Sequence, residues 1–418
     1  MAQLSDDCFA HQGPLLSVEE AARRMAAQVP AIAEIETVAL AEALGRILAA
    51  DVIAPIPLPS FDNSAVDGYA VRHADVGPEG ETRFPVVARV SAGARPARAL
   101  ARGEAARIFT GAPMPEGADT VYMQEDCKRE GETVIVPAGL KRGANRRLTG
   151  EDVRQGAVAL PAGRRLAPAD VALAAAIGLR GLKVRRRPRV AIFSTGDEIV
   201  EPGKKLGPAG LFDANRYLLI GLLRALGAET HDLGILADDV EVLTGAIGNA
   251  AADHDLVLTS GGVSTGEADH VKTAVERLGR LVFWRLAIKP GRPVAMGVIR
   301  GTAFAGLPGN PVAVFVTFVH VVRPLLLRLA GATAGPFVPL PVKAAFHYGK
   351  KKGRREYVRV ALRPAADGGY EAVKHPQEGA GVLTSLTETD GLAELREDVT
   401  QVEPGSTIGF LSYATLVG

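Results

Sequence analysis

The segment DLVLTSGGVSTGEADH, residues 255–270, runs from an apolar stretch into a glycine-rich turn, and it decides the fold of the middle of the chain. The stretch from Leu256 to Thr259 has the length and composition of a buried strand. Adjacent glycines at Gly261 and Gly262 follow it, so bare backbone amides are exposed where the strand ends. Such amides bind anions. The segment therefore predicts a parallel strand that carries a binding turn at its carboxyl end.

Strand-like and helix-like stretches alternate before this turn. Residues 190–193 and 231–236 are typical of strands, whereas residues 215–226 and the stretch up to about residue 252 are typical of helices. Connections of helical length imply parallel pairing with right-handed crossovers. Ligands of such sheets gather at the carboxyl ends of the strands. We therefore expect a doubly wound parallel α/β domain with its site at that edge.

Two more glycine-rich turns, IKPGRP at residues 288–293 and GLPGNP at residues 306–311, also end apolar runs. We expect both to lie at tips of parallel strands. In the first turn, Lys289 and Arg292 are spaced rigidly and suit an anion clamp, although surface charges in a turn are the alternative. In the second turn, Asn310 as a helix cap before a proline explains the sequence without any ligand. A helix opening there would still present its positive end to the same ligand.

Six acidic residues follow neighbouring strands of this sheet: Asp197, Glu198, Asp238, Asp239, Glu267 and Asp269. Several carboxylates in one cleft repel each other unless a cation lies among them, and Mg²⁺ prefers oxygen ligands. The alternative is that half of them are helix caps or solvated charges, which we expect at least for Asp197 and Asp239.

Composition restricts the class of protein. A chain of 418 residues exceeds what one hydrophobic core usually supports, so several domains are expected. With 48 Lys and Arg against 47 Asp and Glu, the charge balance does not favour nucleic acid. Two cysteines make no disulfide framework, and we expect no membrane span, because the apolar run 312–322 is too short. A soluble, cytoplasmic protein is expected.

The remaining stretches are predicted from local signals. Helices are expected at residues 17–29, 40–50, 168–179 and 312–329, and strands are expected at 83–90, 133–136, 338–345, 356–362, 370–373 and 408–411. The basic run 183–189 is interpreted as a solvated linker. Zinc is improbable because no histidine or cysteine pair has ligand spacing, and no phosphate-binding loop of the GxxxxGK[ST] type occurs.

Eight motifs in order along the chain resemble the molybdenum insertase family, molybdopterin molybdenumtransferase, which includes the bacterial MoeA proteins and the gephyrin E domain. The resemblance extends from about Ser17 to the C-terminus. The motifs are FDNSAVDGYAVR (61–72), FTGAPMPEGADTV (109–121), NRRLTGEDV (145–153), FSTGDEIV (193–200), FDANR (212–216), TSGGVSTGEADH (259–270), LAIKPGRP (286–293) and AGLPGNPVA (305–313).

This resemblance implies an elongated homodimer of four-domain subunits. The expected parts are a discontinuous helical linker domain (1–52 and 151–187), a β-rich domain (53–150), a molybdopterin-binding α/β domain (188–334) and a C-terminal β-barrel (335–418). The implied reaction converts adenylyl-molybdopterin and molybdate into molybdenum cofactor and AMP with Mg²⁺. Contact with a molybdopterin adenylyltransferase and with recipient molybdoenzymes is also expected, and contact with nucleic acid or membrane is not.

The resemblance also assigns roles to residues of this sequence. The catalytic group is expected to be Asp67, Asp152, Asp238, Asp269 and Lys289, with Asp238 and Asp269 at the metal. Residues expected to bind the substrates are Thr110, Glu198, Ser260, Gly261, Gly262, Ser264, Arg285, Arg292, Pro308, Gly309, Arg354 and Ser385. Because subunits pair in the family, residues of the β-rich domain are expected to face the α/β site of the partner chain.

Three positions depart from the family pattern. Arg285 stands where many relatives have lysine, Ala313 stands where a serine is common, and TDGL at 389–392 replaces an ANGL-like stretch. Two other functions stay open. A molybdopterin adenylyltransferase would need the α/β domain alone and would leave the motifs between residues 61 and 153 unexplained. A non-catalytic scaffold protein would not depend on the acidic residues.

Overall fold

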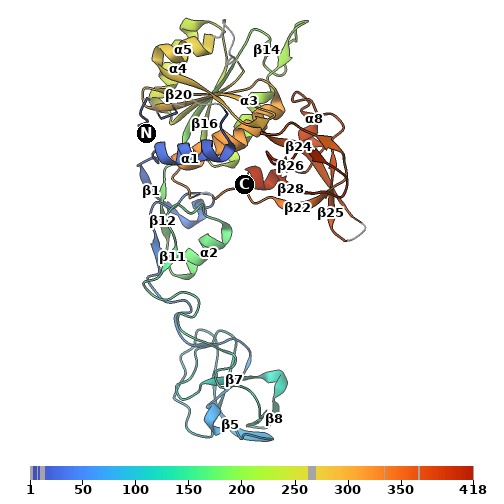
Figure 1. Cartoon of the computed structure of the whole chain (residues 1–418). Coiled ribbons are helices and arrows are strands. Elements are labelled where there is room, and N and C mark those ends of the chain that lie inside the picture. The colour runs from blue at the N-terminus through green and yellow to red at the C-terminus, as the bar shows by residue number, and fades with distance from the viewer. Residues whose placement is uncertain are drawn as a thin grey trace.

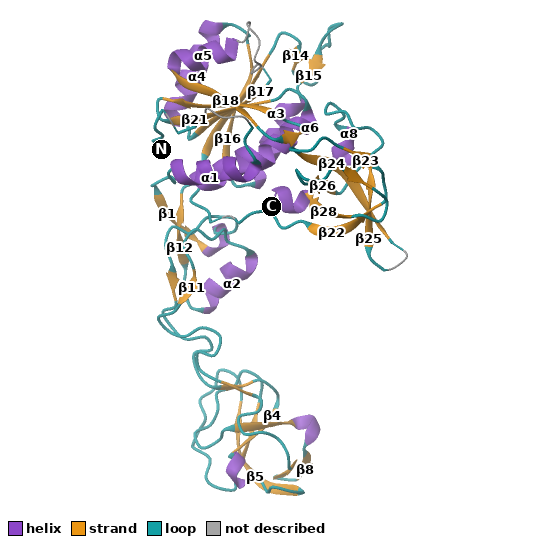
Figure 2. Cartoon of the chain, in the orientation of Figure 1, coloured by secondary structure: helices purple, strands orange, loops and turns teal. Residues whose placement is uncertain are grey.

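The computed structural model describes residues 3–6, 8–9, 15–261, 270–333, 335–365 and 368–417. The molecule is elongated, with an α/β region at one end, a β-rich region at the other, and a narrower region between them (Figure 1). A second β region, the C-terminal barrel, lies beside the α/β region (Figure 2). The expected multidomain architecture of α/β and β parts is therefore confirmed.

The α/β region is built on a six-stranded sheet in the order β16-β13-β17-β21-β20-β18. The first four strands pair in parallel, and β20 and β18 add an antiparallel edge. The strands are β13 (Arg189–Thr195), β16 (Glu229–Leu236), β17 (Leu256–Ser260), β18 (Gly279–Arg285), β20 (Pro293–Ile299) and β21 (Thr302–Leu307). The helices are α3 (Ala214–Ala225), α4 (Val240–Asp253) and α5 (His270–Leu278). The alternation predicted from the sequence is confirmed.

One expectation about this sheet is wrong. The turn IKPGRP follows β18, an antiparallel strand, so it does not lie at the tip of a parallel strand. Its first two residues form β19 (Ile288–Lys289), which pairs with β24 (Arg355–Pro364) of the barrel instead. A local apolar pattern does not identify the partner strand, because that partner lies some 67 residues further along the chain. The turn therefore joins the α/β region to the barrel.

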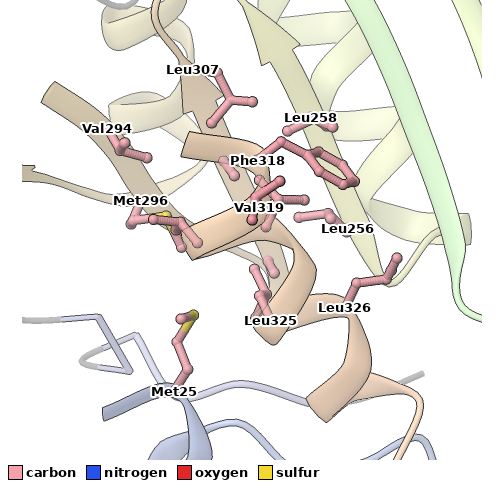
Figure 3. Close-up of a cluster of buried hydrophobic side chains, with 14 of the residues drawn as sticks. Met25, Leu256, Leu258, Val294, Met296, Leu307, Phe318, Val319, Leu325 and Leu326 are labelled. Atoms are coloured by element: carbon pink, nitrogen blue, oxygen red, sulfur yellow. The ribbon is translucent and has the colours of Figure 1, made fainter. Parts of the chain in front are cut away.

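A continuous helical stretch, Pro311–Leu329, lies in the core of the α/β region. It consists of α6 (Pro311–Thr317), a π-helical segment (Phe318–Val322) and α7 (Arg323–Leu329). By length and composition alone it could cross a membrane, but 83% of its apolar window is buried within the protein. Figure 3 shows Phe318 and Val319 of this stretch packed near Leu256 and Leu258 of β17. Full burial of such side chains contributes roughly 1.5–3 kcal/mol each, which accounts for the apolar composition.

Helix α1 (Val18–Gln28) confirms the helix predicted at the start of the chain, and the Ser17 hydroxyl caps it by accepting from the Glu20 amide at 3.1 Å. Met25 of this helix belongs to the same hydrophobic cluster as Phe318 and Leu256 (Figure 3). Figure 1 shows α1 between the α/β sheet and the narrower region.

The narrower region differs from the sequence prediction at two places. The helix expected at 40–50 is wrong, because only the 3₁₀ turn Leu40–Glu42 forms. Gly45 has a φ of +73°, and the residues that follow it make isolated β-bridges instead of helical hydrogen bonds. The basic run 183–189 is no solvated linker, because its first residues belong to β12 (Gly181–Arg185), which pairs with β1 (Ile35–Ala39). Arg186 further pairs with Asp255, whose side chain is fully buried. The other elements are β2 (Val52–Ile53), β11 (Val158–Leu160) and α2 (Pro168–Ala176).

The β-rich region has a six-stranded arrangement in the order β7-β4-β6-β5-β9-β8. It confirms the strands predicted around residues 83–90 and 133–136. The bounds are β4 (Gly68–Val71), β5 (Glu81–Val90), β6 (Ala105–Ile108), β7 (Thr120–Met123), β8 (Lys128–Glu130) and β9 (Thr133–Pro137), with short turns His73–Asp75 and Gln124–Asp126 and a small pair, β3 (Asn63–Ser64) and β10 (Arg146–Arg147).

The C-terminal strands close into a barrel. Strand β24 pairs with both β25 and β26, and β28 joins β26 to β22, which returns to β25. The bounds are β22 (Leu340–Ala344), β25 (Tyr370–Lys374), β26 (Gly391–Leu395) and β28 (Thr407–Ser412), with the short pair β23 (Tyr348–Gly349) and β27 (Gln401–Val402) and the short helices α8 (Thr384–Thr387) and α9 (Tyr413–Val417). One further pair, β14 (Ile199–Val200) and β15 (Leu211–Phe212), projects from the α/β region (Figure 2).

Candidate functional site

Two of the glycine-rich turns meet at the carboxyl edge of the parallel sheet. The Ser260 hydroxyl donates to the Pro308 carbonyl at 3.1 Å, and the Gly261 amide donates to the Leu307 carbonyl at 3.0 Å. The Asn215 amide nitrogen, from α3, donates to Ser260 at 3.0 Å and to the Gly309 carbonyl at 2.6 Å. The predicted residues Ser260, Gly261, Pro308 and Gly309 are thus brought together. Asn215 is not among the predicted site residues, although it lies in the quoted motif FDANR.

Asp238 lies just after β16 on the same edge. Its side chain is partly exposed, and one carboxylate oxygen is 3.5 Å from the Thr195 hydroxyl and from His270 Nδ1. His270 Nδ1 also contacts the Asp238 backbone carbonyl at 2.7 Å, and because a carbonyl only accepts, this nitrogen carries the proton. A loosely held carboxylate at a strand end is therefore available to a ligand.

The other acidic residues predicted at this edge are not gathered around Asp238 in the part of the chain that the structure describes. Asp239 caps α4 by accepting from the amides of Glu241 and Val242 at 2.9 and 3.0 Å, which confirms the alternative expected for it. The side chains of Asp197 and Glu198 are exposed. Gly262, Ser264, Glu267 and Asp269 lie outside the described residues. Among the described residues, no group of three His, Cys, Asp or Glu side chains could together hold a metal ion.

The turn IKPGRP separates two cavities at the boundary between the α/β region and the barrel. The first, of about 380 Å³, is lined by the turn together with Tyr348, Glu356 and Arg359. The second, of about 260 Å³, is lined by the same turn with Arg354 and two neighbouring lysines, Lys351 and Lys352. The predicted residues Lys289 and Arg292 belong to this turn and line both cavities, and Arg354 lines the second, so cations outnumber acids here.

Close packing fixes the position of this turn. Gly291 has a φ of +96°, and a Cβ atom there would lie 2.5 Å from the Thr317 side chain and 3.1 Å from the Ala313 carbonyl. Only glycine fits both the conformation and the space. The turn therefore rests directly on α6, the helix that GLPGNP opens.

One buried carboxylate, Glu356, connects the cations of the two cavities. It accepts from Arg354 Nε at 2.7 Å, from the Tyr348 hydroxyl at 2.8 Å and from Lys289 Nζ at 3.3 Å. Burial works against ionisation of Glu356, but the hydrogen bonds from Tyr348 and Arg354 and the charge of Lys289 outweigh it, so its pKa lies below the ordinary value. Glu356 is therefore ionised at neutral pH.

Arg359 is a buried cation that lines the first cavity. Its Nε donates to Ser385 Oγ at 3.0 Å, and its Nη2 donates to the carbonyls of Gln377 and Gly379. The predicted residue Ser385 is itself fully buried, and its hydroxyl donates to the Val382 carbonyl, so it reaches this cavity through Arg359. Arg359 is not among the residues predicted from the sequence. An arginine amid the apolar strand pattern YVRVA is the signal that could have identified it.

A further polar cluster lies on the β-rich region. Asp67 accepts from the Thr110 amide at 2.8 Å and from the Thr110 hydroxyl at 2.7 Å, and these bonds lower its pKa. Arg107, beside it, stacks over the rings of Tyr69 and Phe109 at about 5 Å. The predicted pair Asp67 and Thr110 is thus in contact.

The remaining predicted residues are exposed. The Asp152 side chain lies at the surface near the junction with the narrower region, and Arg285 ends β18 opposite Pro293. Figure 1 places β5 and β7, two strands of the β-rich region, at the opposite end of the molecule from the α/β sheet. Within one chain, Asp67 therefore does not lie beside Asp238 or Lys289.

Comparison with known proteins agrees with this architecture over most of the chain. Residues 16–178 match the MoeA N-terminal region (domain I and II), residues 191–328 match a probable molybdopterin binding domain, and residues 341–413 match the MoeA C-terminal region (domain IV). The molybdopterin molybdenumtransferase of Haemophilus influenzae is 37% identical, and the match covers 97% of this chain and all of that protein. The molybdopterin molybdenumtransferase of a Nostoc species is 39% identical, covering 94% and 93%.

A solved structure extends the likeness to three dimensions. The crystal structure of the molybdopterin biosynthesis MoeA protein from Pyrococcus horikoshii OT3 has a TM-score of 0.79 at 30% identity, covering 96% of this chain and all of that one. Fold and site together define a multidomain protein whose α/β region and barrel share a cationic boundary. The chain belongs to the MoeA family.

Proposed function

We propose that this chain inserts molybdenum during molybdenum cofactor biosynthesis, converting adenylyl-molybdopterin and molybdate into molybdenum cofactor and AMP. The observation that carries the proposal is the pair of cavities around IKPGRP, where Lys289, Arg292 and Arg354 converge. Molybdate is a tetrahedral dianion, and the pterin substrate carries a pyrophosphate. Cations in and beside a rigid turn can hold these like charges close together.

The glycine-rich turns supply the second half of the substrate site. Ser260, Gly261 and Gly309 lie together at the carboxyl edge of the sheet. Backbone N–H groups of such turns can donate to a phosphate-bearing ligand. The turn GLPGNP opens α6, which in turn supports Gly291 of IKPGRP. The two anions would thus be held by elements that pack directly against each other, so that their reacting groups are kept in fixed orientation.

The donor set near Asp238 fits Mg²⁺. An oxygen ligand that is partly exposed and only weakly bonded, beside a threonine hydroxyl, suits a hard cation that keeps several waters. Asp238 would hold the ion together with Asp269. When bound, Mg²⁺ supplies charge neutralisation at the phosphoanhydride. His270 holds the backbone at this position through its bond to the Asp238 carbonyl.

The site would be completed by a second subunit. We place Asp67, Thr110 and Asp152 of one chain opposite the α/β site of its homodimer partner, with Glu198 and Arg285 of that partner at the rim. Contacts with a molybdopterin adenylyltransferase and with recipient molybdoenzymes, a cytoplasmic location, and the domain boundaries near residues 52, 150, 187 and 334 belong to the same proposal.

The match to MoeA regions before and after the α/β region favours this function over an adenylyltransferase, which would need that region alone. The cation cluster also favours an enzyme over a scaffold. The test is cofactor formation from adenylyl-molybdopterin, molybdate and Mg²⁺ by wild type and by Asp238→Ala. We expect turnover to fall at least about tenfold, roughly 1.4 kcal/mol of transition-state stabilisation.

The matched control is Asp239→Ala, because the neighbouring carboxylate is used as a helix cap. Its effect should appear in thermal stability rather than in turnover. Equal turnover in wild type and Asp238→Ala, or adenylylation of molybdopterin from ATP by the wild type, would contradict the proposed function.

A further inference from the structure

We propose that Glu356 is a positioning residue: it orients Lys289 and Arg354 toward the bound oxyanion and thereby couples the α/β region to the barrel. The inference rests on the proposed function, because it concerns the same cavities. Glu356 itself is 1% exposed, so it is no ligand for an anion. A negative charge beside an anion site would weaken anion binding unless it served another purpose. We infer that this purpose is to hold the neighbouring cations in place.

The backbone places Glu356 opposite Lys289. Strand β19 pairs in parallel with β24, and in this register Lys289 lies beside Glu356 while Ile288 lies beside Arg355. The Arg355 amide donates to the Ala287 carbonyl at 2.8 Å, which extends the pairing. The glycine-rich turn of the α/β region is therefore fixed to a barrel strand at the residue that carries the carboxylate.

The two oxygens of Glu356 have separate tasks. Oε1 accepts from Arg354 Nε, which leaves the terminal nitrogens of that guanidinium available to a ligand in the second cavity. Oε2 accepts from the Tyr348 hydroxyl at 2.8 Å and from Lys289 Nζ at the longer distance of 3.3 Å. Lys289 Nζ also donates to the Tyr348 hydroxyl at 3.3 Å. One buried carboxylate thus holds both Lys289, which lines the two cavities, and Arg354, which lines the second.

The contacts of Glu356 hold the two cations in position and do not merely neutralise their charges. The Lys289 side chain is half-exposed, and its bonds to Glu356 and Tyr348 use two of its three N–H donors. The ammonium is therefore kept beside the cavities with one donor left for an arriving oxyanion. Arg354 is held by a short, charge-assisted bond and keeps its direction. Holding long cationic side chains in place before binding reduces the entropy lost when the anion arrives.

Substitution with glutamine separates positioning from simple electrostatics, because the two predict opposite signs. Glu356→Gln removes a negative charge, so an electrostatic role alone predicts tighter molybdate binding. In the glutamine side chain, an NH₂ group replaces one of the two carboxylate oxygens. That group cannot accept a hydrogen bond, so the contact with either Lys289 or Arg354 is lost. Positioning therefore predicts weaker binding.

The experiment is calorimetric titration of sodium molybdate into the full-length protein, with thermal unfolding measured in parallel. We expect Lys289→Ala to weaken binding at least about tenfold, which tests the proposed site itself. We expect Glu356→Gln to weaken it about fivefold, and Glu356→Asp, which keeps the charge on a shorter side chain, to weaken it by about twofold to threefold. Tyr348→Phe removes only the bridging hydroxyl and should weaken binding about twofold.

The KM values give a second readout that a merely structural role would not reproduce. We expect Glu356→Gln to raise the KM for molybdate and to leave the KM for adenylyl-molybdopterin and the rate at saturating molybdate within about twofold of wild type. Molybdate binding by Glu356→Gln that equals or exceeds wild type would overturn the inference. If that variant does not fold, unchanged binding by Tyr348→Phe would overturn it. Wild-type binding that does not depend on Lys289 would instead refute the proposed function.

Discussion

At the scale of single residues, Asp62 shows how a carboxylate can stabilise the β-rich region rather than take part in a reaction. It accepts from the Thr149 amide and hydroxyl, both at 2.7 Å, and pairs with Arg146. Burial alone would raise the pKa of Asp62, but the hydrogen bonds from Arg146 and Thr149 outweigh it and lower the pKa to about 2. Because the folded pKa is depressed below the ordinary value of 3.8, its contribution to stability is present above that value and is lost as pH falls toward 2.

We therefore predict that Asp62→Asn lowers the local opening free energy around Thr149 by about 1 kcal/mol at pH 7, a figure discounted for solvent screening. The difference from wild type should shrink as pH falls from about 4 toward 2. Hydrogen exchange of peptides covering residues 146–150, compared at equal pH, measures it. Exposed Glu79→Gln is the control, and a difference that is constant over this pH range would refute the explanation.

At the scale of elements, the turn IKPGRP depends on its contact with α6. Gly291→Ala would bring a methyl group within 2.5 Å of Thr317, in a left-handed conformation. We predict a loss of about 1–3 kcal/mol in unfolding free energy from overpacking and backbone strain, together with weaker molybdate binding. Gly405→Ala is the matched control, since Gly405 has a φ of +87° with nothing within 4 Å of the added methyl and lines neither cavity. Denaturant unfolding and calorimetry measure both effects. Equal losses in the two variants would show that contact with α6 is unimportant.

The sequence predicted an element best where a short stretch contains the features that define it, such as a continuous apolar run or a helix cap. The buried run Leu256–Ser260 and the capped helix α1 are examples, and both formed as expected. The pairing of β19 with β24 and of β1 with β12 could not be predicted, because each joins stretches far apart in the chain. The grouping of Ser260 with Gly309 could be predicted, because both follow parallel strands of one sheet. The contact between Ser385 and Arg359 could not, because it depends on how the barrel closes.

At the scale of the whole molecule, the elongated shape sets where a complete site can form. The β-rich region that carries Asp67 lies at the opposite end of the chain from the α/β sheet (Figure 1). The cavities around Lys289 lie at the boundary between that sheet and the barrel. If both residues serve one reaction, they must come from different subunits of a symmetric homodimer, in which each of two equivalent sites takes Asp67 from one chain and Lys289 from the other.

Mixed dimers test this arrangement directly. We expect Asp67→Ala and Lys289→Ala homodimers each to be nearly inactive. A dimer with one chain of each kind would have both substitutions in one site and none in the other, so half of its sites would be intact. The isolated mixed dimers should therefore recover about half of the wild-type activity. An unfractionated mixture, in which random assembly of equal amounts makes about half of the dimers mixed, should recover about a quarter. Co-expression with two different affinity tags, followed by cofactor formation assays on the doubly tagged fraction, measures the recovery. If Asp67 and Lys289 acted within one chain, each site of a mixed dimer would carry one substitution, and no activity would return.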